Sequence, residues 1–341
     1  MNRVFIYPLL ILSLFASATC FAESEDGGYA GVFTTMGIGA RPIGLGRAFT
    51  GLCDDVNGGY WNPAGVARVE EFTIGGMYRR LDLDRRYNFF NLATPIMGDA
   101  SLGLSWINAG VSDVQGRDSD GLPTEEIKNR KNAISLSFAR RLVQKEPLEM
   151  LSLGVNMKYI QEDLANLNAY GVGFDFGVFL QMTEEYAVGF AVQNIGSRYN
   201  WDSGDYYARY GSQGNTYKET FPVNFRFGAS GLFFDKHLVV ASDIEKNNKQ
   251  ETRVHFGGEY WLFREVLKEV ESEGGSEEAT VRLLVEDRWV GIRAGYDDGR
   301  LTFGGSLWQE VKWFDLGVGY AFVTAKVDEN PEHVISIELQ F

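Results

Sequence analysis

The chain has 341 residues, of which 45% are hydrophobic and 14% aromatic, with 40 glycines and only 8 prolines. Its formal net charge of −14 excludes the basic footprint that nucleic-acid binding requires, so we expect no nucleic-acid partner. After residue 22 no uninterrupted apolar stretch reaches about 18 residues, which excludes helical membrane spans. The abundance of glycine and aromatic residues predicts strands joined by turns.

The first 22 residues have the pattern of a secretory signal peptide. Met1-Asn2-Arg3 is a short basic start, an apolar run follows over Val4–Phe15, and small residues precede Glu23. This order predicts export and cleavage after Ala22, with a site at Ala16-Ser17-Ala18 as the alternative.

Cys20 raises the alternative of a lipoprotein anchor, although Ser17-Ala18-Thr19 lacks the leucine usually found three residues before such a cysteine. If the signal peptide is removed, Cys53 is the single cysteine that remains, and no intramolecular disulfide is expected.

Residues 37–67, GIGARPIGLGRAFTGLCDDVNGGYWNPAGVA, follow neither a helical nor a strand period. Their glycines allow close backbone approach and positive φ. Asn62-Pro63-Ala64-Gly65 predicts a turn or a short helix with Asn62 as its cap and Pro63 at its first position. A nucleotide loop over Gly37–Gly46 is not expected, because no buried strand precedes it and no lysine follows.

Two kinds of charged residue occur within this segment. Asp54 and Asp55 could form an acid pair, but a turn cap and an ion pair with an arginine such as Arg226 or Arg293 explain them more simply. Arg41 and Arg47 are predicted to reach carboxylates elsewhere and fix the segment in place.

From residue 70 onward, alternating segments of roughly ten residues recur between turn signals, as transmembrane β-strands do. We count about fourteen of them, near 70–80, 86–95, 100–109, 131–142, 150–162, 168–181, 186–195, 220–231, 236–246, 252–262, 287–296, 300–308, 312–323 and 333–341. One face of each is apolar and the other is polar or small, which differs from the continuous apolar runs of doubly buried strands.

An even strand count puts the first and the last residues of the barrel both on the periplasmic side. The long links 111–129 and 197–219 then lie outside the cell, and the links near 97–99 and 182–184 are short periplasmic turns. The acidic insertion 263–286 is the exception, since this register puts it in the periplasm. It is either a helix-turn element or a sign that the count is off by one.

The last nine residues alternate almost perfectly and end on an aromatic residue, Phe341. A strand of a soluble β-sandwich could look the same. The segment more closely resembles the closing strand of bacterial outer-membrane barrels, in which the terminal aromatic belongs to the signal for the barrel-assembly machinery. Aromatic residues gather at segment ends, as in Tyr260-Trp261 and Trp313-Phe314, and predict interfacial girdles.

Three further patterns were weighed as sites. The histidines, His237, His255 and His333, are on separate predicted strands without metal-ligand spacing, so no metal, no cofactor and no enzyme activity are expected. The run 118–121, Asp-Ser-Asp-Gly, weakly resembles a calcium loop but is better explained as a solvated turn. The loop Tyr199–Tyr210 is either a contact surface or a cover over the barrel mouth.

The segment GARPIGLGRAFTGLCDDVNGGYWNPAGVA, together with AVQNIG (191–196) and GIRAGYDDGRLTFGGSL (291–307), resembles the PorV/PorQ family of FadL/TodX-like outer-membrane proteins. The resemblance implies a signal peptide (1–22), a hatch inside the lumen (23–68) and a transmembrane barrel of about 14 antiparallel strands (69–341). The chain is shorter than a plain long-chain fatty acid transporter and lacks an obvious apolar external arm.

The resemblance further implies an outer-membrane channel for small hydrophobic compounds such as fatty acids, which move between hatch and wall. The alternative is a PorV-like adaptor or shuttle for secreted proteins. Expected partners are outer-membrane lipids, hydrophobic small molecules and the barrel-assembly machinery. Candidate hatch and ligand residues are four hinge glycines, a set of possible pocket residues and the turn: Gly37, Gly39, Gly44, Gly46, Phe49, Asp54, Asp55, Tyr60, Trp61, Asn62, Pro63, Ala64 and Gly65.

Overall fold

The computed structural model describes residues 28–96, 98–145, 148–165, 167–208, 211–271, 280–326 and 330–341. The predicted signal peptide and its cleavage site lie outside these ranges and stay predictions. Within the described ranges, the few helices are all too short or too polar to cross a membrane.

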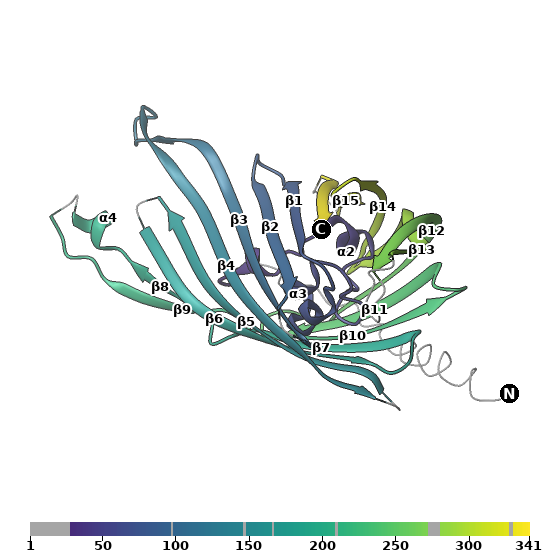
Figure 1. Cartoon of the computed structure of the whole chain (residues 1–341). Coiled ribbons are helices and arrows are strands. Elements are labelled where there is room, and N and C mark those ends of the chain that lie inside the picture. Colours follow the sequence, from purple (N-terminus) through teal and green to yellow (C-terminus); the bar gives the residue numbers. More distant parts are fainter. Residues whose placement is uncertain are drawn as a thin grey trace.

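In the described residues, sixteen antiparallel strands form one sheet, and fourteen of them close into a barrel through the pairing of β5 with β6 (Figure 1). The first strand pairs with the last, β1 with β16. The predicted all-β barrel of about 14 strands is therefore confirmed. The barrel strands are β1 (Thr73–Arg80), β2 (Arg86–Pro95), β3 (Ala100–Arg117), β4 (Pro123–Lys145), β5 (Leu148–Leu164), β6 (Leu167–Gln181), β7 (Tyr186–Ile195), β10 (Asn224–Phe233), β11 (Leu238–Asn247), β12 (Arg253–Glu271), β13 (Thr280–Asp297), β14 (Arg300–Val311), β15 (Phe314–Val323) and β16 (Glu332–Gln340).

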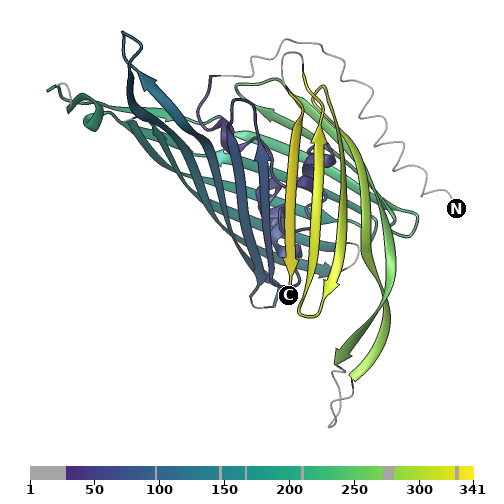
Figure 2. The same cartoon turned by 90° about the horizontal axis from the view of Figure 1, so that it is seen from above.

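The two long links predicted at one end of the barrel contain strands. Most of 111–129 belongs to β3 and β4, whose ladder continues beyond the pair Val111↔Asn129. The segment 197–219 forms β8 (Arg198–Asp202), α4 (Gly204–Ala208) and β9 (Thr216–Thr220), and β8 pairs with the start of β6. Both hairpins project at the end away from the C-terminus (Figure 2). The prediction that these two segments are long loops was wrong. Each strand is longer than its alternating apolar part, because hydrogen bonds between paired strands satisfy the backbone beyond it.

The acidic insertion 263–286 is also a hairpin rather than a helix-turn element. β12 and β13 stay paired as far as Glu271↔Thr280, with a register shift at Leu262/Phe263. The strand count is not off by one, so neither alternative for this segment holds in its described part. The hairpin projects at the end where the C-terminus lies (Figure 2).

The two faces of the wall differ in composition, as the alternation predicts. On β6 the side chains of Val172, Phe174 and Phe176 are exposed on the outside, whereas Asp175 and Phe179 face inward and are buried. Similar outward apolar residues recur around the ring, for example on β4, β10 and β16. The outer surface is thus an apolar belt of the kind that faces lipid.

The described N-terminal residues lie inside the ring of strands (Figures 1 and 2). They contain short helical turns and no strand: η2 (Val32–Thr34), α2 (Ala40–Gly44), α3 (Gly58–Trp61) and η3 (Pro63–Arg68). Nearly all residues from Gly37 to Ala67 are buried. We call residues 28–69 the N-terminal segment.

Candidate functional site

The backbone of the N-terminal segment packs directly against glycines of the inner wall. A Cβ added at Gly154 on β5 would lie 2.2 Å from the carbonyl carbon of Pro63. One added at Gly228 on β10 would lie 2.6 Å from the amide nitrogen of Gly51. Atoms cannot approach so closely, so only glycine at these wall positions lets the segment pack directly against the strands.

Arg41 joins the segment to β12 through a buried ion pair. Its Nη2 lies 2.8 Å from Oε2 of Glu259, which is fully buried, and its Nη1 lies 2.5 Å from Oδ1 of Asp54. Glu259 also lies 3.1 Å from Nε of Arg293. The guanidinium of Arg41 lies over the ring of Trp261, 5.9 Å from its centroid. One wall carboxylate therefore holds two buried arginines, one of them on the segment.

Arg47 lies between two carboxylates on different strands. It is 3.8 Å from Glu245 on β11 and 3.9 Å from Asp297 on β13. His255 lies between the same two carboxylates, 3.3 Å and 3.1 Å away. Arg47 is thus the second arginine of the segment that reaches wall carboxylates, as the sequence predicted for it and for Arg41.

A wall pair of opposite charges binds the backbone around residue 49. Oδ2 of Asp243 accepts the backbone N–H groups of Phe49 and Thr50 at 3.2 Å and 3.0 Å. Arg226 pairs with the same carboxylate at 2.9 Å and donates to the carbonyl oxygen of Arg47. Its guanidinium also lies over the ring of Trp61, 4.9 Å from the centroid. The pair therefore fixes the chain direction between residues 47 and 50.

Neutral amides hold the second part of the segment. The Asn62 side chain accepts the N–H of Ala64 at 3.1 Å and donates to the carbonyl oxygen of Val178 on β6 at 2.9 Å. Asn62 is therefore the cap that the sequence predicted for the turn beginning at Pro63, and it also contacts the wall. Asn156 on β5 donates to the carbonyl oxygen of Gly59 at 2.9 Å.

The predicted hinge glycines are closely packed. Gly37, Gly39 and Gly46 have positive φ values of 84°, 81° and 66°. A Cβ added at Gly46 would lie 2.4 Å from the carbonyl oxygen of Tyr296, and one at Gly44 would lie 2.8 Å from the side chain of Arg293. The structure therefore gives these glycines a packing role, and hinge motion at them stays a prediction.

Asp54 and Asp55 have different environments although they are neighbours in sequence. Asp55 caps a turn, since its Oδ1 accepts the N–H of Asn57 at 2.8 Å. Asp54 pairs with Arg41 and with Arg288, whose Nη2 lies 3.0 Å from its Oδ2. The simpler sequence explanation holds, with Arg41 and Arg288 in place of Arg226 or Arg293.

The two carboxyl groups also differ in acidity. Burial alone would raise the pKa of Asp54, but the guanidiniums of Arg41 and Arg288 outweigh it and hold the pKa well below its ordinary value. Burial raises the pKa of Asp55, against the opposing effect of Arg41.

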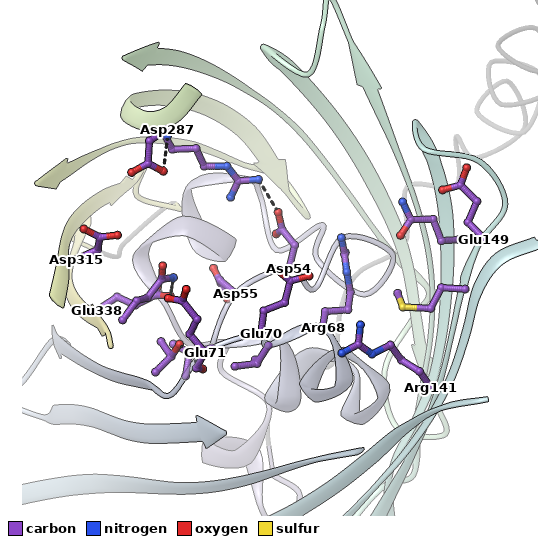
Figure 3. A pocket seen from close by; sticks show the side chains of 17 residues that line it. Asp54, Asp55, Arg68, Glu70, Glu71, Arg141, Glu149, Asp287, Asp315 and Glu338 are labelled. Carbon is purple, nitrogen blue, oxygen red and sulfur yellow. Dashed lines mark hydrogen bonds and ion pairs between the residues drawn. The ribbon is translucent and has the colours of Figure 1, made fainter. Parts of the chain in front are cut away.

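A pocket of about 540 Å³ lies at the end of the barrel where β1 begins and β16 ends. Asp54 and Asp55 line it from the segment, and carboxylates and arginines from five wall strands and the 68–71 linker complete it (Figure 3). The labelled side chains around it are Arg68, Glu70, Glu71, Arg141, Glu149, Asp287, Asp315 and Glu338. Carboxylates outnumber guanidiniums, so this end of the lumen is strongly polar.

The aromatic residues proposed from sequence as ligand contacts do not line this pocket. Phe49 and Trp61 are fully buried, and the N–H of Trp61 donates to the carbonyl oxygen of Ile38 at 3.2 Å. Tyr60 is partly exposed and packs edge-on against Phe89 of β2, with ring centroids 6.3 Å apart.

The remaining sequence candidates lie at the two ends of the barrel. Phe341 donates its N–H to the carbonyl oxygen of Phe72 at 3.0 Å, which joins the chain end to the start of β1. At the opposite end, Oδ1 of Asp118 accepts the N–H groups of Asp120 and Leu122 in a solvated turn. On β8, Tyr199 is buried against Phe221, so this residue offers no contact surface.

Sequence reasoning missed the wall carboxylates that bind the segment, which are Asp243, Glu245, Glu259 and Asp297. A signal was present, because Asp243 and Glu245 alternate with outward Ile244 on β11 and so must face the lumen. Inward charges on an otherwise apolar strand indicate a buried polar partner.

Comparison with known proteins supports the fold. Neither a protein-family model nor a curated protein sequence matches the chain. The CymD monoaromatic hydrocarbon channel matches with a TM-score of 0.52 and 14% identity over 89% of this chain and 98% of that one. The Pseudomonas putida toluene transporter TodX gives a TM-score of 0.52 at 11% identity (87% and 96%), and a Pseudomonas aeruginosa FadL homologue gives 0.51 at 12% (87% and 97%). At such identities these similarities show a shared barrel fold.

Proposed function

We propose that this protein is an outer-membrane channel for small hydrophobic compounds, with residues 23–68 as a hatch inside the barrel of residues 69–341. The apolar belt around the barrel supports insertion into a membrane. The even number of strands supports a periplasmic position for the first and last residues of the barrel, as expected for a chain inserted from the periplasm. Phe341, at the end of the closing strand, would belong to the signal for the barrel-assembly machinery.

The observation that carries the proposal is an apolar row on the inner wall. Met77, Phe89, Ile107, Ala133 and Ile160 are all buried and stand opposite one another in register across β1 to β5. An inner wall that only solvates a pore has no need of such a row. A small apolar ligand that leaves water for this surface would gain about 25 cal/mol per Å² of buried area.

The N-terminal segment covers one end of this row. The N–H of Gly39 lies 3.1 Å from Sδ of Met77, Tyr60 packs on Phe89, and the hydroxyl group of Tyr87 donates to the carbonyl oxygen of Phe33. A ligand that reaches the row would therefore lie between hatch and wall. TodX and CymD, whose printed descriptions name toluene and monoaromatic hydrocarbons, share the barrel fold and make this ligand class the first to test.

Uptake by whole cells tests the proposal. A deletion strain that carries the wild-type gene should accumulate labelled toluene or a labelled fatty acid several-fold faster than the strain without it. Ile160→Asn should abolish most of this gain because it places an amide in the row, and Ser135→Asn, inward on β4 but outside the row, should retain it. Equal uptake with and without the protein, for both compounds, would rule the channel out.

The second candidate is a PorV-like adaptor for secreted proteins. It is favoured by the exposed rings of Tyr207 and Tyr217, which stand on the hairpin that projects away from the C-terminal end. Exposed tyrosines are common in binding loops. If deletion leaves uptake unchanged but makes secreted proteins accumulate in the periplasm, the adaptor is the correct function.

A further inference from the structure

The loop from Leu52 to Val56 is held in a strained backbone conformation at Cys53. The φ angle of Cys53 is 25°, a left-handed value that residues with a Cβ rarely adopt. A Cβ added at Gly65 would lie 2.9 Å from its Sγ, and one at Gly58 would lie 2.9 Å from its carbonyl oxygen. Such strain persists only where the surroundings impose it, and it marks loops that can switch.

An ion pair at the next residue closes this loop against the wall. Oδ2 of Asp54 lies 3.0 Å from Nη2 of Arg288 on β13. The Asp54 side chain is 10% exposed, whereas that of Arg288 is 38% exposed. Trp261 lies beneath the Arg288 guanidinium, 5.2 Å from the ring centroid to Cζ. Arg288 therefore joins the loop to the wall, and solvent reaches its side chain.

Empty space for the loop lies beside this pair. Asp54, Asp55 and Val56 line the pocket of about 540 Å³ on one side, and Arg288 lines it on another (Figure 3). The loop therefore has room to move when the pair with Arg288 opens, while Asp54 keeps its ion pair of 2.5 Å with Arg41 of the same segment. Arg41 would keep its hydrogen bonds from Nε and Nη2 to Glu259 in that event, so the anchor of the segment would survive.

We propose that the ion pair between Asp54 and Arg288 is a latch that keeps the Leu52–Val56 loop closed, and that its opening moves the loop into the pocket. This inference rests on the proposed function, in which the N-terminal segment is a hatch. It identifies the Leu52–Val56 loop as the part of that hatch that moves. It differs from hinge motion at the glycines between residues 37 and 46.

Cys53 reports on the latch without any engineered probe. Its side chain is fully buried, and burial raises the pKa of its thiol to about 12, so the closed loop presents almost no thiolate at neutral pH. Alkylation of the folded protein by a maleimide should therefore be slow and should follow loop opening. Peptide mass spectrometry assigns the product to Cys53 and separates it from any product at Cys20.

Arg288→Gln should raise the Cys53 alkylation rate at least about tenfold, because Asp54 loses its wall partner. Asp54→Asn removes this charge pair together with the pair between Asp54 and Arg41, so its effect should be at least as large. The matched control is Arg141→Gln, since Arg141 lines the same pocket but makes no ion pair among the described residues. Its rate should stay within about twofold of wild type.

Salt gives a second measurement on the unaltered protein. Raising the ionic strength from about 0.05 M to 1 M screens a partly exposed ion pair and should also accelerate alkylation. The latch is overturned if Arg288→Gln and Asp54→Asn label no faster than Arg141→Gln, or if the wild-type rate is independent of salt. Heat-modifiable gel mobility checks that each variant keeps its barrel. If a variant loses its barrel, the salt series on the wild-type protein decides whether the latch exists.

Alkylation is independent of transport. If labelling follows the latch while cells show no uptake, the proposed function is wrong and the latch stands. If uptake is present and labelling is unaffected by the variants, the channel stands and its hatch opens elsewhere.

Discussion

The N-terminal segment is held by charge on one side of the barrel and by neutral groups on the other. Residues 40–55 meet β10–β13 through buried ion pairs such as that between Arg41 and Glu259. Residues 56–68 meet β2–β7 through neutral amide side chains. Glycines admit the backbone on both sides, as Gly154 does for Pro63 and Gly228 for Gly51. The same segment thus uses two kinds of contact within one lumen.

The difference shows what each kind of contact can specify. A buried ion pair identifies one residue by its charge and is costly if a partner is lost, because the other charge then stays desolvated. A glycine contact identifies no side chain and depends only on backbone shape, so it fails when volume is added. The charged side should therefore be the more sensitive to the removal of a group, whereas the neutral side should be sensitive mainly to the addition of one.

The largest effect is expected from Glu259→Gln. It keeps the side-chain shape but leaves Arg41 and Arg293, both buried, without their shared carboxylate charge. Breaking a buried charge pair typically costs about 3–5 kcal/mol. The free energy of unfolding, measured by urea titration of the protein folded in lipid vesicles, should fall by about that amount.

Glu310→Gln on β14 is the control for Glu259→Gln, because its side chain is exposed and the carboxylate lies outside this network. It should change the free energy of unfolding by less than about 0.5 kcal/mol. Comparable losses for both variants would mean that the network around Glu259 does not anchor the segment.

A smaller effect is expected on the neutral side from Gly154→Ala. The added methyl group would meet the backbone of Pro63 and Ala64 at 2.2–2.4 Å, and no flexible side chain can give way. Overpacking of this kind typically costs about 1–3 kcal/mol. The matched control is Gly76→Ala on β1, where the nearest atom to the new Cβ, the carbonyl oxygen of Phe89, is 3.9 Å away. If both substitutions lower the urea midpoint of unfolding by the same amount, the close approach at Gly154 does not contribute to stability.

The barrel was predictable because strand periodicity is local. Ile335 and Ile337, with Ser336 between them, reveal both faces of β16 without knowledge of its neighbours. The extended β3–β4 and β12–β13 hairpins were not, since their outer parts carry charges and turn residues and are strands only through pairing across the hairpin. Ladder pairing between segments is a property of the assembled sheet.

The candidate site was predictable only in part, for the same reason. The contact of Arg41 and Arg47 with wall carboxylates was predictable because they are the two arginines in residues 37–67, a segment made mainly of glycine and apolar residues. Their partners, Glu259 and Glu245, did not follow, because strand order and register decide which inward residue faces the segment. Trp61 was expected at a pocket, yet it packs against the guanidiniums of Arg47 and Arg226, a neighbourhood that its residue type does not reveal.

The smallest effect is expected where charge is present without burial. Arg80 and Asp84 form an ion pair of 2.6 Å, nearly as short as that of Arg41 with Asp54, but their side chains are 69% and 79% exposed. Solvent screens such a pair, so Arg80→Ala should lower the free energy of unfolding by no more than about 0.5 kcal/mol and should leave Cys53 alkylation unchanged. A loss as large as that of Glu259→Gln would show that charge alone, and not its desolvation against the N-terminal segment, distinguishes the two sides of the lumen.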